Sequence, residues 1–292
     1  MPDYKGKPEF LEKTDIPSDS GEDFLREWER VDVYLPTTTE ISPVPEESRL
    51  VVYSDPTCPG ADRFRMAQIR LKSLQAARKL KNLLITSPLP MDGKSTVALN
   101  MATVLAENGK VPVLLVEADV YRPVLVNRLG LEPWPGLTEC YEHGDDPIPA
   151  IRRIEPLGIN LLPAGHPVED GVGLFQSNFA KQLFKRLSSS FFSWILIDAP
   201  PTTPVASILA LKAYANATLL VARAGYTPRE AIEESTRNLG SDQILGIILN
   251  GVEGLDHIYS KYYGYRYGKP KRPAKPAKHK AIESLGLNEL AK

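Results

Sequence analysis

Short apolar runs alternate with amphipathic stretches between residues 82 and 252 of this chain. The runs are apolar throughout, which is the pattern of strands that are buried on both faces. Segments with helical spacing of their apolar residues separate these runs. The pattern predicts an α/β fold, a doubly wound and mostly parallel sheet with helices on both faces. The predicted strands are Leu83–Ser87, Val113–Glu117, Asn160–Pro163, Trp194–Asp198, Ala217–Ala222 and Leu245–Asn250, and the predicted helices lie near 95–108, 122–129, 173–188, 203–213 and 228–239.

The two ends of the chain differ from this pattern. The N-terminal segment is rich in Pro, Asp and Glu, and we expect a mostly flexible arm in which Leu50–Tyr53 is the clear strand-like run and Asp23–Val33 a short helix. Residues 61–81 predict a basic, amphipathic helix. The C-terminal segment holds a tyrosine cluster and then a basic, proline-rich tail. The predicted division is an arm over 1–60, a nucleotide-binding domain over 61–255 and a tail over 256–292.

Composition narrows the class of protein. The 292 residues are 42% hydrophobic and 24% charged with a net charge of −1, which is ordinary for a soluble chain with one large domain. Cys58 and Cys140 are the two cysteines, too few for a disulfide framework or a cysteine-rich metal site. No apolar run approaches the ~18–20 residues of a membrane span, and the chain starts without an apolar signal core. We therefore expect a cytoplasmic protein.

The most informative motif is the loop that follows the first predicted strand, residues 87–96. It ends in Gly-Lys-Ser-Thr and leads directly into a helical pattern, an arrangement that holds a nucleotide phosphate chain on backbone N–H groups. Lys94 supplies a positive charge, and the Ser95 hydroxyl can ligate Mg²⁺. Pro88 stands where the strict Walker A pattern has its first glycine. The loop alone therefore leaves both a variant phosphate loop and a chance match open.

Two further predicted strands end in carboxylates. Glu117 ends one strand and is followed by Asp119, and Asp198 ends another before a double proline. The carboxyl ends of parallel strands meet at one edge of a sheet, where ligands bind. Carboxylates at that edge can hold the Mg²⁺ of a nucleoside triphosphate and accept a proton from an attacking hydroxyl. A single such Asp is often only a polar strand end, but the three segments together predict a nucleotide site.

At this point the chain resembles the bacterial tyrosine kinases of capsule and exopolysaccharide synthesis, P-loop proteins similar to the MinD/ParA ATPases. The resemblance covers roughly residues 60–268. It is carried by the loop at 87–96, the acidic strand end before Arg122-Pro123, the Asp198-Ala-Pro-Pro201 motif and the tyrosine cluster. It implies an ATP-dependent protein-tyrosine autokinase that regulates polysaccharide polymerisation and export, with ATP and Mg²⁺ as cofactors.

The resemblance also implies a role for each matched residue. Lys94 would contact the β and γ phosphates, while Glu117 and Asp119 would help to activate a tyrosine hydroxyl, whose pKa of about 10 makes a base necessary. Asn250 would contact adenine, although it also fits a polar strand end. The implied nucleotide-binding residues are Asp92, Gly93, Lys94, Ser95, Thr96 and Asn250, the metal-binding residues Ser95, Glu117 and Asp198, the catalytic residues Lys94, Glu117, Asp119 and Asp198, and the phosphoacceptors Tyr259, Tyr262, Tyr263, Tyr265 and Tyr267.

The resemblance further implies partners. The start of the basic helix, with Asp62, Phe64 and Arg65, is similar to the family's oligomerisation motif and implies a homo-oligomer in which one subunit's tail enters its neighbour's site. A membrane chain-length or adaptor protein on a separate chain would hold the kinase at the inner face of the cell membrane. The basic tail could bind an anionic membrane surface at about 1 kcal/mol per basic residue. No nucleic acid is expected, because the folded part lacks an aromatic and basic recognition pattern.

Two positions depart from the family pattern. Met91 stands in the loop where a glycine is usual, and a positive φ there would cost a methionine about 1–2 kcal/mol. Glu117 stands where Asp is usual, and Mg²⁺ demands strict octahedral geometry. Two alternatives therefore accompany the kinase interpretation. One is a catalytically weak nucleotide-binding scaffold of the same machinery. The other is a MinD/ParA-like ATPase, although Ser87–Asp92 lacks the lysine that such proteins carry in the loop.

Overall fold

We analysed a computed structural model, which describes residues 38–203 and 206–253. The predicted helix at Asp23–Val33, the tyrosine cluster and the basic tail lie outside these residues. The elements in chain order are β1 (Thr39–Ile41), η1 (Glu46–Ser48), α2 (Val51–Ser54), α3 (Pro59–Arg78), β2 (Asn82–Thr86), α4 (Lys94–Ala106), β3 (Val113–Glu117), α5 (Leu125–Arg128), α6 (Leu137–His143), η2 (Ile148–Ala150), β4 (Arg152–Glu155), β5 (Ile159–Leu162), α7 (Gly171–Gln176), α8 (Asn178–Ser189), β6 (Trp194–Asp198), α9 (Ser207–Lys212), β7 (Ala217–Arg223), α10 (Arg229–Leu239) and β8 (Ile244–Asn250).

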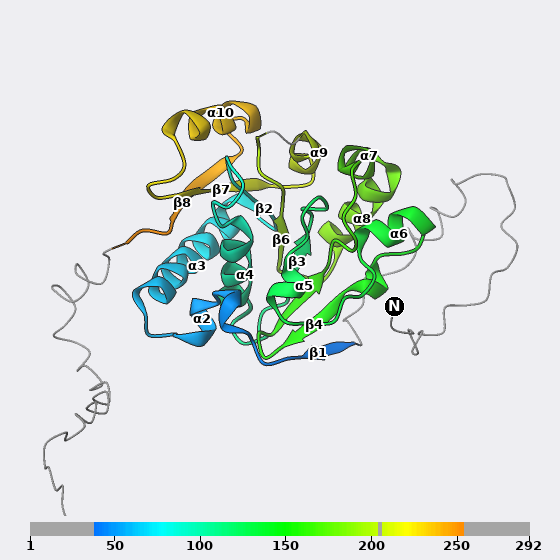
Figure 1. Cartoon of the computed structure of the whole chain (residues 1–292), viewed down its shortest axis with the longest axis horizontal. Helices are drawn as coiled ribbons and strands as arrows, with labels where there is room; N and C mark the ends of the chain where they lie inside the picture. Colours follow the sequence, from blue (N-terminus) through cyan, green and yellow to red (C-terminus); the bar gives the residue numbers. More distant parts are fainter. Residues whose placement is uncertain (1–37, 204–205, 254–292) are drawn as a thin grey trace, which may run out of the picture. The chain divides into compact units, whose positions relative to one another are not determined.

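The strands form one sheet in the order β1-β4-β5-β3-β6-β2-β7-β8 (Figure 1). All pairings from β5 to β8 along this order are parallel. Strand β4 is antiparallel to β5, and β1 is parallel to β4. The doubly wound, mostly parallel sheet predicted from the sequence is confirmed. Strand β2 lies between β6 and β7, so the loop at its carboxyl end sits over the middle of the sheet.

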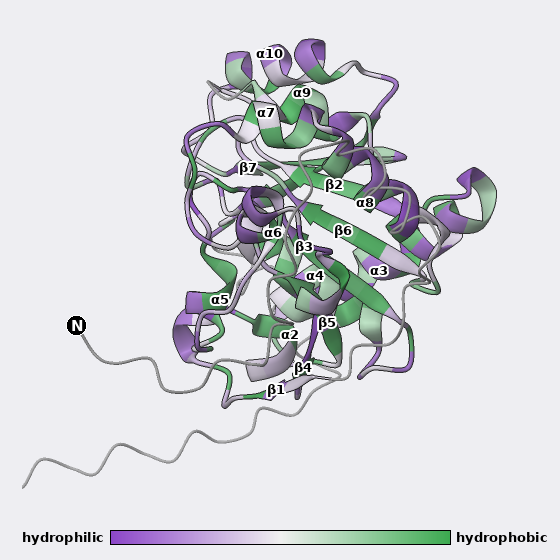
Figure 2. Ribbon diagram, turned by 90° about the vertical axis from the view of Figure 1, so that its right-hand side faces the viewer, coloured by the Kyte–Doolittle hydropathy of each residue, from purple (hydrophilic) through white to green (hydrophobic). Residues whose placement is uncertain are grey.

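The core consists of two apolar layers, one on each face of the sheet. Leu84, Leu114 and Ile197 belong to the layer that packs against α6 to α10. Leu83 and Leu115, their immediate neighbours along the strands, belong to the layer that packs against α3 and α4. Because successive strand residues point to opposite faces, strands that are apolar throughout fill both layers. Figure 2 shows β2 and β6 coloured as hydrophobic, between helices with hydrophilic outer sides.

Residues 38–60 differ from the flexible arm that was expected. They add β1 to the sheet edge, and Leu50 is only 1% exposed. Leu50–Tyr53, which reads as a strand, lies mostly in the short helix α2. The cause is a contact far along the chain: the Asn100 side chain on α4 accepts from Val52 N–H (3.3 Å) and donates to the Arg49 carbonyl (2.9 Å). The division of the chain elsewhere, over 1–37 and from 254 on, stays a prediction.

Other boundaries shift for local reasons. The helix predicted near 173–188 is two helices, α7 and α8, because Ser177 has an extended ψ of 164° and caps α8 by accepting from Ala180 N–H (3.2 Å). The pattern missed α6 and β4. Strand β4 reads Arg-Arg-Ile-Glu, and only Ile154 of it is buried. No helix in the described part of the chain is both long and apolar enough to span a bilayer.

We expect Asn100→Ala to lower the free energy of unfolding by about 1–3 kcal/mol, because two backbone groups of residues 49–52 lose their partner. Urea denaturation of the whole chain measures this change. The matched control is Thr103→Ala, one turn along the same helix, whose hydroxyl donates only to the local Leu99 carbonyl; its effect should stay within about 0.5 kcal/mol. Equal effects of the two substitutions would contradict this account of residues 38–60.

Candidate active site

The loop between β2 and α4 is held by its own aspartate and by two distant elements. The buried Asp92 carboxylate accepts from Leu89 N–H (2.9 Å) and from the Thr227 hydroxyl (2.6 Å). Asn250, at the end of β8, donates from Nδ2 to the Asp92 carbonyl (2.9 Å). Gly93 has a φ of 97°, and a Cβ there would lie 2.0 Å from Asn250 Nδ2. The loop shape therefore requires glycine at 93 and depends on residues from the opposite end of the chain.

The Met91 backbone is strained, but its side chain leaves the loop free. Met91 has a φ of 67°, the left-handed conformation that favours glycine. Its side chain is 78% exposed, so it extends toward solvent and not into the loop. The anticipated cost in backbone strain is therefore present, and the side chain does not narrow the loop.

Lys94 and two carboxylates form a buried charged cluster at the start of α4. The Lys94 ammonium donates to Asp119 Oδ2 (2.6 Å) and to Ser95 Oγ (3.3 Å), and lies 3.9 Å from Asp198 Oδ1. Burial alone would lower the pKa of Lys94, but the charges of Asp198 and Asp119 outweigh it and raise the pKa. Lys94 is therefore a fixed positive charge at the edge where the phosphate loop begins its helix.

Asp198 is fully buried, and neither of its carboxylate oxygens has a hydrogen-bond partner among residues 38–203 and 206–253. Burial raises the pKa of Asp198, against the opposing charge of Lys94. The Ser95 hydroxyl lies beside it, outside hydrogen-bond geometry. A buried carboxylate without donors is costly, and Mg²⁺ with its bound waters would satisfy it. The donor set of one hydroxyl and one carboxylate therefore fits Mg²⁺, which uses few protein ligands beside substrate phosphates.

The metal would depend on phosphate oxygens for the rest of its coordination. No cluster of three or more His, Cys, Asp or Glu side chains with the arrangement of a metal site occurs within residues 38–203 and 206–253. Mg²⁺ at such sites usually keeps several waters and binds the nucleotide at the same time. Ser95 and Asp198 would therefore hold Mg²⁺ together with a bound nucleotide.

Glu117 is placed differently from the prediction. Its Oε1 accepts from Val124 N–H (2.5 Å) and Leu125 N–H (2.7 Å), and its Oε2 accepts from Ala164 N–H (3.3 Å). It is the register partner of Asp198 across β3 and β6, yet the structure does not bring its oxygens into contact with Lys94. Burial raises the pKa of Glu117, while these N–H groups lower it. Its implied roles as metal ligand and base stay predictions that would require these bonds to open.

Arg128 is a residue that sequence reasoning missed. Its guanidinium donates to the Thr96 hydroxyl on the first turn of α4. Burial lowers the pKa of Arg128, against the attraction of Asp198. Arg128 thus links α5 to the phosphate loop and adds a second cation near Asp198. Arg128 belongs to none of the motifs that predicted the site. The sequence indicated only that it lies in the predicted helix near 122–129.

The implied oligomer residues are engaged within the chain. Arg65 forms an ion pair with Asp62 (2.7 Å) and donates to the Pro56 carbonyl (2.5 Å). Phe64 is partly buried against the core. Their role between subunits stays a prediction, as does that of the implied phosphoacceptors, which lie outside the described residues: Tyr259, Tyr262, Tyr263, Tyr265 and Tyr267.

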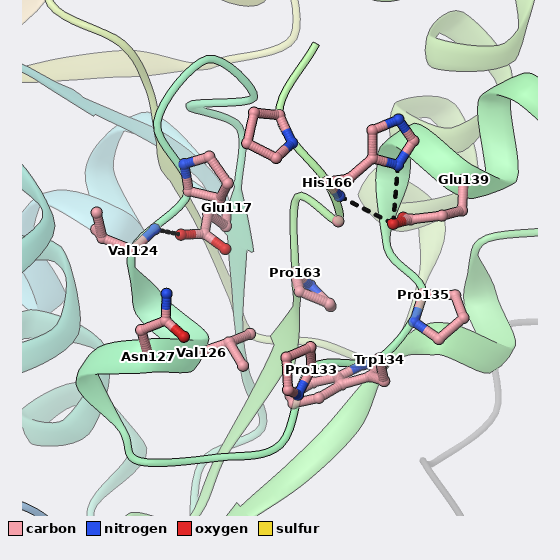
Figure 3. Close-up of a pocket in the computed structure, with 13 residues that line it drawn as sticks. Glu117, Val124, Val126, Asn127, Pro133, Trp134, Pro135, Glu139, Pro163 and His166 are labelled. Atoms are coloured by element: carbon pink, nitrogen blue, oxygen red, sulfur yellow. Dashed lines mark hydrogen bonds and ion pairs between the residues drawn. The ribbon is translucent and has the colours of Figure 1, made fainter. Parts of the chain in front are cut away.

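A cavity of about 450 Å³ is lined in part by Glu117 (Figure 3). Glu117 and Val124 border it on one side, and Glu139 and His166 on the other. His166 is held by two carboxylates, Glu139 at Nδ1 (3.0 Å) and Glu142 at Nε2 (3.1 Å). The hydrogen bond with Glu139 raises the pKa of His166 above its ordinary value of 6.5. No motif in the sequence pointed to this cavity.

We expect Met91→Gly to raise the free energy of unfolding by about 1 kcal/mol, because glycine adopts a positive φ without steric cost. Chemical denaturation with and without Mg-ATP measures the gain and any change in nucleotide affinity. Met91→Ala keeps the Cβ and should give no gain. A large change in affinity for Met91→Gly would contradict the outward placement of the Met91 side chain.

His166 should stabilise the fold in a pH-dependent way. Because its folded-state pKa is raised, its contribution is fully present below pH 6.5 and is lost as the pH rises through the folded-state value. The stability difference between the wild type and His166→Gln should therefore be larger near about pH 6 than near about pH 9. His143→Gln, at the end of α6, is the control. A difference that grows with pH would refute the ion pair with Glu139.

Comparison with known proteins finds relatives among the bacterial tyrosine kinases. No family model matches the chain. The tyrosine-protein kinase YwqD of Bacillus subtilis is 27% identical over 220 residues, covering 75% of this chain and 92% of YwqD. The succinoglycan biosynthesis transport protein ExoP of Rhizobium meliloti is 30% identical over 236 residues, and the tyrosine-protein kinase ptk of Acinetobacter johnsonii 28% over 235. The chain covers 30% of ExoP and 32% of ptk, so it spans about a third of these two relatives.

Solved structures agree in fold. The VpsO kinase domain is 26% identical with a TM-score of 0.58, covering 66% of this chain and 98% of that domain. The kinase domain of the Escherichia coli tyrosine kinase ETK is 24% identical with a TM-score of 0.64, covering 70% of this chain and 80% of that one. Curated relatives and solved kinase domains thus converge, and the chain is a homologue of the bacterial tyrosine kinases.

Proposed function

We propose that this chain is an ATP-dependent protein-tyrosine kinase that phosphorylates copies of itself and regulates exopolysaccharide or capsule synthesis and export. The observation that carries the proposal is the buried cluster of Lys94, Asp119 and Asp198 beside the phosphate loop. The relatives named as tyrosine-protein kinases support the activity, and ExoP, named for succinoglycan biosynthesis transport, supports the setting.

ATP and Mg²⁺ are the proposed cofactors. The loop N–H groups and the start of α4 would hold the phosphate chain, and Lys94 would turn from Asp119 to the β and γ phosphates. Ser95 and Asp198 would hold the metal, Asp198 through a bound water. Asn250 would contact adenine, and its hydrogen bond to the Asp92 carbonyl would also hold the loop in shape. When bound, Mg²⁺ supplies neutralisation of the phosphate charge that develops during transfer.

In this proposal Asp119 accepts the proton of the tyrosine hydroxyl. Its Oδ2 is bound by Lys94, and its Oδ1 accepts from Arg122 N–H (3.3 Å). Movement of Lys94 onto a phosphate would free Oδ2 to accept the tyrosine proton. A carboxylate beside a metal-bound phosphate is the usual way for a kinase to activate a hydroxyl at neutral pH.

The partners follow from the same proposal. Subunits would associate through the Asp62, Phe64 and Arg65 segment, and the tail tyrosines of one copy would enter the site of another. A membrane chain-length or adaptor protein on a separate chain would hold the kinase at the inner face of the cell membrane, in keeping with ExoP, of which this chain matches 30%. The basic tail would add affinity for an anionic membrane surface.

A second candidate is a nucleotide-binding scaffold with weak transfer. The observation in its favour is that all the hydrogen bonds of Glu117 go to backbone N–H groups and none to the charged cluster. ATP binding by calorimetry without any phosphotyrosine would favour this candidate over the kinase.

We expect purified full-length protein to gain phosphotyrosine with Mg-ATP, and Lys94→Met and Asp198→Asn to lose it by at least about a hundredfold, since both remove phosphate or metal contacts. Transfer between copies is tested by mixing. A variant with Phe at the five tail tyrosines keeps the active site, and a Lys94→Met variant keeps the tyrosines. Label should appear on the Lys94→Met chain. Thermal unfolding of each variant checks that it is folded, and equal labelling of wild type and Lys94→Met would exclude the kinase.

A further inference from the structure

The cavity beside Glu117 has walls of an unusual kind. Five prolines line it, together with Trp134 and Val126. Figure 3 shows Pro133, Trp134, Pro135 and Pro163 gathered on its floor. The Trp134 indole is fixed, because Nε1 donates to the Ala150 carbonyl (2.9 Å) and the Arg152 guanidinium lies 4.6 Å from its ring centroid. Trp134 is only 7% exposed, so it adds a small area to a surface made mainly of proline rings. Such a rigid surface needs little ordering when a ligand binds. The lining prolines are Pro123, Pro133, Pro135, Pro163 and Pro167.

The carboxylates around the cavity outnumber its cations, because the guanidinium of Arg152 beside Trp134 is already paired with Glu40. Glu139 lines it, and Glu142 contacts the lining His166. Glu132 precedes the lining Pro133 and is exposed. Aromatic surfaces flanked by carboxylates recognise proline-rich segments with basic residues, which dock in the polyproline II conformation. The cavity therefore fits an extended, basic and proline-containing peptide better than it fits an anionic nucleotide.

The chain itself contains such a peptide. Residues 268–280 read GKPKRPAKPAKHK, with six Lys or Arg and no Asp or Glu. The prolines stand at every third position, Pro270, Pro273 and Pro276, each preceded by a basic residue. A polyproline II helix has three residues per turn, so this spacing puts the prolines on one side and the preceding cations on the next. We propose that the cavity beside Glu117 is the docking site for residues 268–280 of this chain.

Docking at this cavity would bring tyrosines close to the charged cluster. This part of the inference rests on the kinase function proposed above. Asp119 contacts Lys94, and four residues later Pro123 lines the cavity. The tyrosine cluster directly precedes the docked segment, and Tyr267 is three residues from Pro270, a reach of about 10 Å. Docking would hold tyrosines next to the charged cluster. The 18 residues from Glu253 to Pro270 span up to about 60 Å when fully extended.

The test uses the full chain and its own tryptophan, without nucleotide. A tail variant, Pro270→Ala with Pro273→Ala and Pro276→Ala, leaves the cavity open to an added peptide of residues 268–280. The peptide should bind in calorimetry and change the Trp134 emission. A peptide of the same composition with its three prolines adjacent should bind at least about tenfold more weakly, because charge is kept and spacing is lost. The wild-type chain should bind the added peptide more weakly than the tail variant does.

Substitutions on the protein locate the binding. In the tail variant, Glu142→Lys should weaken the affinity for the peptide by about fivefold. Glu230→Lys on α10 should change this affinity by less than about twofold. Trp134→Phe should remove the emission change and keep the calorimetric signal. This result would assign the emission change to Trp134 and not to Trp28 or Trp194. Equal binding of the two peptides, or equal effects of the two charge reversals, would overturn the proposal.

A membrane is the competing destination of the basic segment. The peptide of residues 268–280 is therefore also mixed with vesicles of anionic phospholipid. Vesicle binding by the peptide with no binding to the protein would overturn the proposal and assign the segment to the membrane. Loss of phosphotyrosine formation with intact peptide binding would count against the kinase function only, because peptide binding requires no ATP.

Discussion

The interaction on which the site depends is the attraction of Lys94 for two carboxylates that the fold buries. Strand β6 runs through the middle of the sheet, and its last side chain, Asp198, is enclosed without a hydrogen-bond donor. The nearest cation, Lys94, gives its short contact to Asp119 and remains 3.9 Å from Asp198. A buried carboxylate without donors lowers the stability of the free protein. The same carboxylate favours a ligand that brings its own cation. The strained backbone of Met91 adds to that cost at the same loop.

The central strands and the charged cluster were predictable because both follow from short, local signals. Val113–Glu117 and Trp194–Asp198 are apolar throughout and end in charge, and the structure reproduces both ranges. Lys94, Asp119 and Asp198 meet because parallel strands share a carboxyl edge. The α2 segment was not predictable in the same way, because its conformation depends on Asn100, which lies about 48 residues away.

The sequence motif predicts the position of Glu117 in the sheet but not the direction of its carboxylate. A carboxylate at a strand end predicts a position in the sheet, and that position is found, since Glu117 pairs with Asp198 in the register. The direction of its oxygens depends on three backbone N–H groups in two loops, and no spacing in the sequence encodes them. Glu117 is both the register partner of Asp198 and one of the residues that line the proline-rich cavity.

A hydrogen bond from Asn250 connects β8 directly to the loop that precedes α4. Asn250 ends β8 and donates to the Asp92 carbonyl, while Thr227, at the far end of the β7–α10 connection, holds the Asp92 carboxylate. Strand β8 is also the last element before the C-terminal segment of the chain. A shift of β8 along its own axis would therefore move the Asp92 carbonyl through a single hydrogen bond. The shape of the loop before α4 is thus coupled to the position of the edge strand β8.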